Sequence, residues 1–267
     1  DIPGYKEFVN AKLGMLEDVV SKFAALPEDL NNRLELLEEY QQERIDFIKN
    51  ILPYFGDKFI LKGGTALSLY YGLNRYSEDL YFDCLTSNMN CINRLKQCKD
   101  FNKRNISIKK DTDMVFIFMI DYGSVLHLEK YPLKIEISSR NKSLLNSNIL
   151  KYNKFDNVNV YCIEDLIEMK ATAFSGRDKI RDFFDLGYLL KEYPHYFKES
   201  TLFSIREKII YSGEDELNLL LKDEILNHKL ISKYEINITD GYAQDILNQI
   251  ETLMIPNSSN KKRNMHR

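Results

Sequence analysis

The sequence predicts an α/β fold, in which a mixed sheet with flanking helices is followed by a C-terminal helical bundle. Helical patterns occupy the first part of the chain, and short β-type segments follow between residues 55 and 162. From Glu164 onward the apolar residues recur at helical spacing. Strands that precede a run of helices, rather than alternating with them, are typical of such mixed folds.

The N-terminal region is expected to form two helices, residues 5–26 and 29–52, with Pro53 closing the second. We expect residues 1–54 to pack on the core through their apolar stripes.

Five segments then have the pattern of strands. Leu133, Ile135 and Ile137 alternate with polar residues, as in a strand that is buried on one face. The predicted strands are residues 58–61, 80–82, 106–109, 114–121 and 133–138.

The second half of the chain is expected to be helical. The amphipathic segments are residues 164–174, 179–191, 199–210, 214–228 and 241–253. We therefore divide the rest of the chain into a sheet domain (55–192), a helical bundle (193–256) and a basic tail (257–267) that is expected to be mobile.

Composition places the chain among ordinary globular proteins, with 44% apolar residues, 29% charged residues and a formal net charge of −3. No apolar run reaches the ~20 residues of a membrane span, so we expect a cytoplasmic protein with no membrane partner. The cysteines fit no zinc spacing and are expected to be reduced thiols: Cys84, Cys91, Cys98 and Cys162.

The residues that carry chemistry concentrate between positions 61 and 83. A strand that ends in Gly63-Gly64 at a helix start offers backbone N–H groups that a triphosphate can approach closely, and Thr65 is placed to cap that helix. Asp79 and Asp83 share one face of the next strand, where carboxylates can hold Mg²⁺ or Mn²⁺. The pattern predicts a nucleotide site; the alternative is a turn followed by a half-exposed strand.

Seven positions of this stretch match one signature at the expected spacing: Gly63, Gly64, Thr65, Leu67, Arg75, Ser77 and Asp79. The string resembles the AbiEii-type nucleotidyltransferase toxin family, whose signature is Gly-Gly-Thr-x-Leu followed by Arg-x-Ser-x-Asp-x-Asp. Residues 164–190 are similar to the family's helical Lys motif and its Arg-Asp-x-x-Asp-Leu motif. The resemblance implies a nucleotidyltransferase fold and the transfer of a nucleoside monophosphate from a nucleoside triphosphate to a hydroxyl acceptor. It also implies an RNA or tRNA substrate and a cognate antitoxin, as for some members.

The site residues follow from the pattern and the resemblance together. Lys170 would neutralise triphosphate charge and Glu136 would orient or deprotonate the acceptor hydroxyl; the alternatives are an exposed lysine and a solvent-facing glutamate. Asp182 is expected to hold the site in an ion-pair network, whereas Asp185 is open between that role and catalysis. The expected nucleotide-binding residues are Lys62, Gly63, Gly64, Thr65, Arg75, Ser77 and Lys170, the catalytic residues Asp79, Glu136 and Asp185, and the metal ligands Asp79, Glu136 and Asp83.

One position departs from the family pattern, because its second metal-binding Asp falls on Tyr81. A phenol is a poor Mg²⁺ ligand near neutral pH, since its pKa is about 10. Three interpretations are open: the enzyme is inactive, it uses Asp79 with Glu136 and Asp83, or the tyrosine is a substitution in this particular chain. The alternative function is therefore a catalytically impaired protein that binds a nucleotide or a partner.

A basic run follows the candidate site, between residues 94 and 110. We expect Lys99, Lys103 and Arg104 to contact a nucleic-acid backbone; the alternative is a solvated face.

Overall fold

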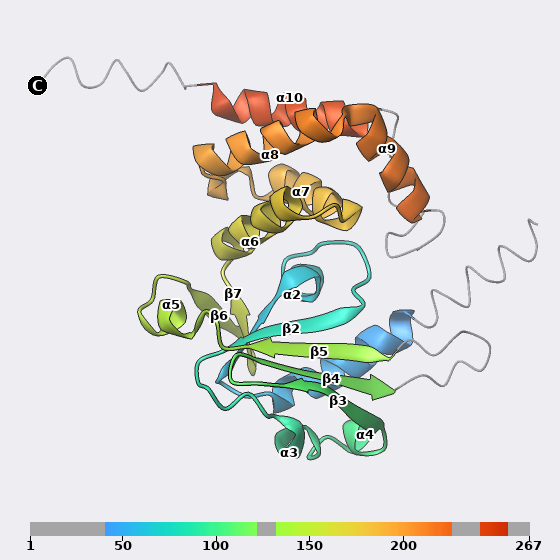
Figure 1. The fold of residues 1–267 in the computed structure, drawn as a ribbon, viewed down its shortest axis with the longest axis vertical. Helices are drawn as coiled ribbons and strands as arrows, with labels where there is room; N and C mark the ends of the chain where they lie inside the picture. Colours follow the sequence, from blue (N-terminus) through green and yellow to red (C-terminus); the bar gives the residue numbers. More distant parts are fainter. Residues whose placement is uncertain (1–40, 122–131, 226–240, 256–267) are drawn as a thin grey trace, which may run out of the picture.

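The computed structural model describes residues 41–121, 132–225 and 241–255. Within these ranges the chain forms two layers, a seven-stranded sheet with short helices around it and a stack of longer helices (Figure 1). The predicted helix 5–26 and the tail 257–267 lie outside the described residues. The architecture confirms the predicted α/β fold with a mixed sheet and a C-terminal helical part.

The centre of the sheet is formed by four strands. β1 (Phe59–Lys62) runs antiparallel to β2 (Asp79–Cys84) and parallel to β7 (Val158–Tyr161). β2 runs parallel to β5 (Leu133–Ser138), whose bounds agree with the predicted strand. These parallel pairs bring together segments that are far apart in the sequence.

Three antiparallel strands complete the sheet, with the order β3-β4-β5-β2-β1-β7-β6. β4 (Val115–Asp121) and β3 (Asn105–Asp111) extend it beyond β5, and β6 (Tyr152–Phe155) forms the other edge. The pair β6–β7 was not predicted, because β6 is exposed and β7 is buried on both faces, so neither alternates.

One face of the sheet carries an aromatic cluster. Phe82 stacks on Phe55 with ring centroids 4.2 Å apart, and Phe59 packs edge-on against both rings. The chain reaches Phe55 from a helical segment, residues 41–51, and the 3-10 helix η1 (Leu52–Tyr54). Burial of each such ring contributes about 1.5–3 kcal/mol to folding.

Two short helices, α3 (Ile92–Leu95) and α4 (Lys99–Asn102), lie at the end of the molecule away from the long helices (Figure 1). A third, α5 (Lys142–Asn146), follows β5.

The opposite face of β2 is polar. Leu80 and Phe82 are buried in the core, whereas the alternate residues Asp79 and Tyr81 point into a cavity beneath the long helices. Helix α2 (Gly63–Tyr70) connects β1 to this side.

The long helices form one layer. α6 (Ile163–Gly176) and α7 (Ile180–Glu192) pack on each other, α8 (Glu199–Ser212) packs on α6, and α10 (Tyr242–Met254) packs on α7 and α8. α9 (Glu214–Asp223) contacts α7, α8 and α10, and the 3-10 helix η2 (Pro194–Tyr196) joins α7 to α8.

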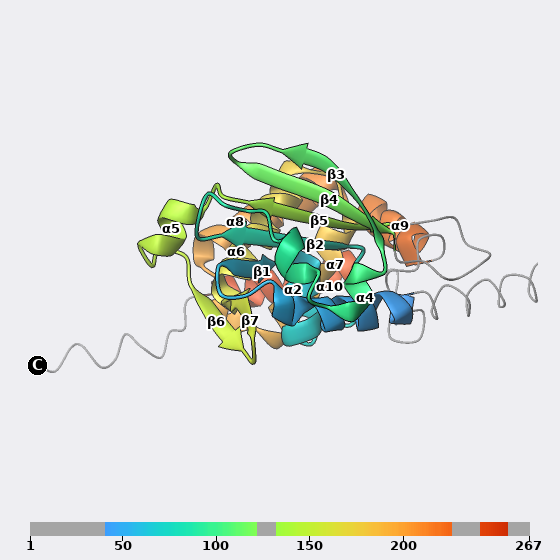
Figure 2. The ribbon, with the colours of Figure 1, turned by 90° about the horizontal axis from the view of Figure 1, so that it is seen from below.

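Seen from below, the sheet lies over this helical layer (Figure 2). Helices on the two sides of the predicted boundary at residue 193 contact each other, since α8 packs on α6.

Within the described ranges, no helix combines the length and the apolar character that a membrane span needs. The four cysteines, all of which are described, are free thiols.

Candidate functional site

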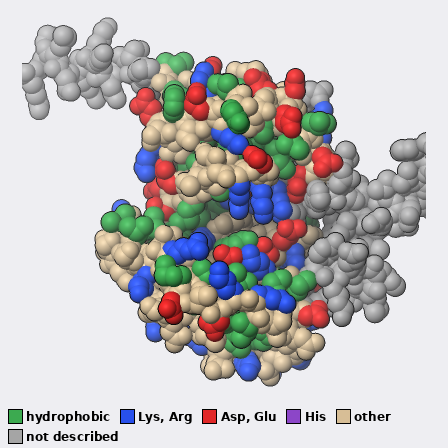
Figure 3. All heavy atoms as spheres, in the orientation of Figure 1, with side chains coloured by type: hydrophobic (Ala, Val, Ile, Leu, Met, Phe, Trp, Pro, Cys, Tyr) green, Lys and Arg blue, Asp and Glu red, His purple; other side chains and the backbone are tan. Residues whose placement is uncertain are grey.

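A cavity of about 350 Å³ lies between the sheet and the first two helices of the helical layer. Figure 3 shows a hollow in the middle of one face, with Lys and Arg side chains around it. Among the residues that the structure describes, six cations and three carboxylates line the cavity: Lys62, Arg75, Lys170, Arg177, Lys179 and Arg181, against Glu78, Asp79 and Asp182. Three further carboxylates, those of Asp83, Asp185 and Glu224, pair with lining cations from behind, so the cavity offers directed cationic donors to an anionic ligand rather than a net positive charge.

Two glycines form one wall, and each is needed for its own reason. Gly63 has a φ of 78°, which residues with a side chain rarely adopt. Gly64 borders Arg75 so closely that a Cβ there would lie 2.4 Å from the Arg75 Nη2 atom. Both glycines line the cavity at the start of α2, where backbone N–H groups have no partner within the helix. The wall therefore offers backbone donors to an anion.

Thr65 ties α2 to the start of β2. Its hydroxyl donates to the carbonyl oxygen of Asp79 at 2.6 Å and is hydrogen bonded to the Ser77 hydroxyl at 2.7 Å. Ser77 and Asp79 line the cavity, whereas Thr65 is buried behind it. Lys62 is the N-cap of α2, so the prediction that Thr65 caps this helix is wrong. Thr65 instead supports two cavity residues, Ser77 and Asp79.

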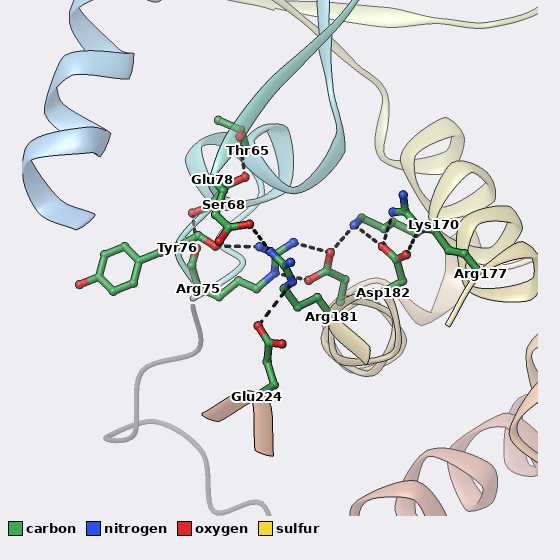
Figure 4. Close-up of polar contacts among 12 residues, drawn as sticks. Thr65, Ser68, Arg75, Tyr76, Glu78, Lys170, Arg177, Arg181, Asp182 and Glu224 are labelled. Carbon is green, nitrogen blue, oxygen red and sulfur yellow. Dashed lines mark hydrogen bonds and ion pairs between the residues drawn. The ribbon is translucent and has the colours of Figure 1, made fainter. Parts of the chain in front are cut away.

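A chain of ion pairs joins the two layers behind the cavity (Figure 4). Arg75 donates to Asp185 of α7 through Nε at 2.5 Å and Nη2 at 2.8 Å. Lys170 Nζ lies 2.5 Å from Asp185 Oδ2 and 2.9 Å from Asp182 Oδ1. Arg177 then donates to Asp182 from Nε at 2.7 Å. The loop before β2 is thereby fixed to both α6 and α7.

Asp185 is fully buried and does not line the cavity. Our prediction left it open between catalysis and support, and its position behind Arg75 and Lys170 is one of support. Asp182 has the expected place in the ion-pair network and also reaches the cavity surface.

The charges of this network are fixed by their neighbours. Burial alone would raise the pKa of Asp185, but the charges of Arg75 and Lys170 outweigh it and lower that pKa. Burial opposes ionisation of Asp182 too, and the hydrogen bond from Arg177 with the charge of Lys170 lowers its pKa. Both carboxylates are therefore charged at neutral pH.

The rim of the cavity carries two further cations. Arg181 Nη1 lies 2.8 Å from Glu78 Oε2, and its Nε lies 3.4 Å from Glu224 Oε1 (Figure 4). Lys179 is exposed at the same rim and forms no ion pair with any residue that the structure describes.

Asp83 is hydrogen bonded to two residues that line the cavity, Lys62 and Asn141. Its buried carboxylate accepts hydrogen bonds from Lys62 Nζ at 2.8 Å, Asn141 Nδ2 at 2.8 Å and the Tyr161 hydroxyl at 2.7 Å. Lys62 and Asn141 line the cavity, whereas Asp83 does not. The alternation along β2 places Asp83 on the face of Asp79, but deeper in the protein.

The phenol of Tyr81 occupies the place of the family's second carboxylate. Its hydroxyl donates to Asp79 Oδ2 at 2.8 Å. Burial, together with the negative charge of Asp79, raises the pKa of Tyr81 to about 12. The phenol is therefore neutral at physiological pH and offers a proton rather than a negative charge.

Glu136 lies beside Tyr81, since the two residues are register partners in β5 and β2. It does not line the cavity, and its Oε2 atom lies 2.8 Å from Lys134 Nζ. Glu136 therefore fits the alternative interpretation of a solvent-facing glutamate: it pairs with Lys134, and its side chain is 29% exposed.

The predicted metal ligands do not form one group. Asp79 is bonded to Tyr81, Asp83 to Lys62 and Glu136 to Lys134. Over the described part of the chain, no three His, Cys, Asp or Glu side chains lie close enough together to hold a metal ion. Asp79, Asp83 and Glu136 therefore do not fit the predicted site, in which all three would hold the same metal.

The basic run is far from the cavity. Lys99 and Lys103 are exposed at α4, on the end of the molecule away from α6 and α7 (Figure 1). Arg104 lies over the ring of Phe47, with 5.5 Å between its Cζ atom and the ring centroid. These side chains cannot contact the same bound nucleotide as the cavity residues.

The comparisons with known proteins agree with this geometry. Residues 47–251 match the family described as nucleotidyl transferase AbiEii toxin of a type IV toxin–antitoxin system. The chain belongs to the AbiEii nucleotidyltransferase toxin family. No curated protein matches the sequence.

Two solved structures share the AbiEii fold of this chain. A proposed nucleotidyltransferase from H. pylori has 29% sequence identity and a TM-score of 0.62, over 78% of this chain and 92% of that one. JHP933 from Helicobacter pylori has 30% identity and a TM-score of 0.65, over 81% of this chain and 92% of that one.

Several cavity residues of this AbiEii chain could not be identified from the sequence. Arg177 and Lys179 lie between the family's two helical motifs, and Arg181 is the first residue of the second motif; only the packing of α7 on α6 turns them to the cavity. Asn141 follows β5, outside every recognised motif. Lys134, outside the cavity lining, shares the polar face of β5 with Glu136, as the sequence pattern predicts, but its contact with the Tyr81 ring depends on the pairing of β2 with β5.

Proposed function

We propose that the chain transfers a nucleoside monophosphate from a nucleoside triphosphate to a hydroxyl of an RNA, as a toxin of the cytoplasm with a cognate antitoxin. The observation that carries the proposal is the cavity itself, in which a wall of backbone N–H groups at Gly63-Gly64 faces a wall of cations on α6 and α7. Membership of the AbiEii family supports the reaction class.

The cationic wall is suited to a triphosphate. Arg177 presents a guanidinium that is half exposed while Asp182 fixes its other edge. Lys179 adds an unpaired ammonium group among the described residues, and Arg181 stands at the rim. Guanidinium groups bind phosphate oxygens in a bidentate manner, which orients the chain of phosphates along this wall.

The acceptor would meet the α-phosphate at the opposite wall. Its hydroxyl oxygen forms a bond to the α-phosphorus, the bond from that phosphorus to the bridging oxygen breaks, and pyrophosphate leaves. Asp79 is the carboxylate of β2 that lines the cavity, so it is placed to take the hydroxyl proton.

A second candidate function is nucleotide binding without transfer. The hydrogen bond from the Tyr81 hydroxyl to Asp79 Oδ2 favours it, because it occupies an oxygen that would otherwise be free to receive the proton of the acceptor hydroxyl. In that case the cavity would act as a sensor or a docking site for a nucleotide-bound partner.

The two functions are separated by one experiment. The purified protein is incubated with each of four α-³²P-labelled nucleoside triphosphates and total RNA, with Mg²⁺, with Mn²⁺ and with EDTA. Transfer predicts label in RNA that Asp79→Asn abolishes. Binding alone predicts no label but saturable nucleotide binding in calorimetry. Failure of both would reject the nucleotide site.

A further inference from the structure

Four side chains form a compact polar group on the face of β2 and β5. The parallel register sets Asp79 opposite Lys134 and Tyr81 opposite Glu136. Tyr81 is hydrogen bonded to Asp79 at 2.8 Å, and Lys134 Nζ lies 2.8 Å from Glu136 Oε2. The same ammonium group lies 5.1 Å from the centroid of the Tyr81 ring. One fixed cation therefore touches two of the other three members.

This arrangement satisfies each carboxylate with a group of the protein itself. Asp79 accepts a hydrogen bond from the Tyr81 hydroxyl, and Glu136 forms an ion pair with Lys134. Lys134 gains a further attraction from the electron-rich face of Tyr81. A divalent cation that entered between the strands would be repelled by the nearby charge of Lys134 and would compete with the Tyr81 hydroxyl for Asp79 Oδ2, and both effects oppose its binding.

We propose that Lys134 is the resident counter-ion of this strand face and that, with Tyr81, it excludes divalent cations from the place where the family pattern has a metal. The nucleotide is then held by the protein's own cations, without a metal bound to the carboxylates. Only this last statement rests on the proposed function; exclusion of the metal is a property of the four side chains alone.

Titration of the full chain with Mn²⁺ alone, followed by electron paramagnetic resonance, tests the exclusion. We expect no saturable site in the unmodified protein below millimolar Mn²⁺. Lys134→Met combined with Tyr81→Asp removes the internal cation and supplies a third carboxylate, so it should tighten Mn²⁺ binding by at least about tenfold. Lys191→Met is the matched control, since Lys191 is an exposed lysine beside Glu192, outside the cavity, and should change nothing.

Either of two results would overturn the proposal. One is stoichiometric Mn²⁺ binding at micromolar concentration by the unmodified protein, which needs no variant to fold. The other is a double variant with an unchanged circular dichroism spectrum that binds Mn²⁺ no more tightly than the unmodified protein.

A second measurement keeps this inference apart from the proposed function. Inorganic tripolyphosphate is titrated into the protein in EDTA, and we expect saturable binding by calorimetry. Binding that appears only when Mg²⁺ replaces EDTA would contradict the nucleotide statement of the inference. Absence of binding under both conditions would contradict the proposed function, and the Mn²⁺ titration would still decide the exclusion.

Discussion

The guanidinium of Arg75 fills the space that a side chain on Gly64 would need. A Cβ at that position would lie 2.4 Å from Arg75 Nη2 and 3.1 Å from its Cζ. Arg75 cannot move away, because Asp185 holds its Nε and Nη2 atoms in a buried ion pair. The second glycine of the motif is thus required by an arginine eleven positions later, and through it by an aspartate of α7.

Gly64→Ala should therefore destabilise the protein by about 1–3 kcal/mol, the usual cost of an overpacked buried site. Thermal and urea unfolding would measure it. Gly176→Ala is the matched control, since a Cβ at Gly176 meets no atom within 4 Å. Equal stability of the two variants would contradict the assigned role of Gly64.

The buried carboxylate of Asp185 predicts a loss of stability in acid. Its pKa in the folded protein is lower than the ordinary value of 3.8, so the unfolded chain takes up the proton first as the pH falls. The stabilisation is complete above about pH 4 and declines below it. Unfolding followed from pH 7 to pH 2 should show this decline.

Replacement of that carboxylate tests the same ion pair. Asp185→Asn should cost about 3–5 kcal/mol at pH 7, because Arg75 and Lys170 lose a shared buried counter-charge. The variant should also show a shallower decline in acid. Asp178→Asn, at an aspartate whose side chain is 87% exposed, is the control and should leave both properties unchanged.

Arg177→Ala should weaken triphosphate binding by about tenfold or more without unfolding the protein. Half of this side chain is exposed and it faces the cavity, so its loss removes a phosphate donor, while buried Asp182 keeps Lys170 as its counter-charge. Calorimetry with tripolyphosphate gives the affinity. Arg206→Ala, an arginine paired with Glu207 on α8 away from the cavity, should bind as the unmodified protein does. Unchanged affinity of Arg177→Ala would remove this residue from the site.

Thr65→Val keeps the shape of the side chain and removes its hydroxyl. The carbonyl oxygen of Asp79 loses its donor, so we expect a loss of about 1–3 kcal/mol in unfolding free energy and weaker triphosphate binding. Thr252→Val removes a hydroxyl that bonds the Asn248 carbonyl oxygen at an exposed position and is the control. A Thr65→Val protein as stable as this control would show that the tie between α2 and β2 is dispensable.

The basic run predicts RNA binding that is independent of the nucleotide cavity. Lys99→Glu with Lys103→Glu should lower RNA affinity and reduce its dependence on salt, because fewer counterions are released. Tripolyphosphate affinity should not change, since α4 lies away from α6 and α7. Arg104 is left intact because it packs over Phe47. Filter binding at several salt concentrations measures the effect, and equal RNA binding by the reversed variant would leave the run as a solvated face.

The elements with a clear period could be predicted from the sequence, and those without one could not. Strand β5 alternates over six residues and was predicted with its bounds, whereas the short strands β6 and β7 have no alternation. The glycine pair was recognised as part of a site, but the reason for Gly64 lies in Arg75, which only the three-dimensional structure reveals.

Site residues were predicted where local spacing decides their position. The two-residue period of a strand places Asp79 and Asp83 on one face, yet it does not tell that Asp83 is enclosed by Lys62, Asn141 and Tyr161. The role of Asp185 was equally hidden, because its partner Arg75 is 110 positions away and the distance between them depends on how the layers pack.

That separation also sets the order in which the molecule can be completed during translation. At about 5–20 residues per second, Arg75 leaves the ribosome roughly 5–20 s before Asp185. Until then its guanidinium remains hydrated, and the cation-bearing wall from α6 and α7 does not exist. A product that ends before residue 163 would contain the whole glycine motif and every strand that the structure describes, yet it would lack the cavity, because one of its walls would be missing. The cavity can therefore form only after α6 and α7 have been synthesised.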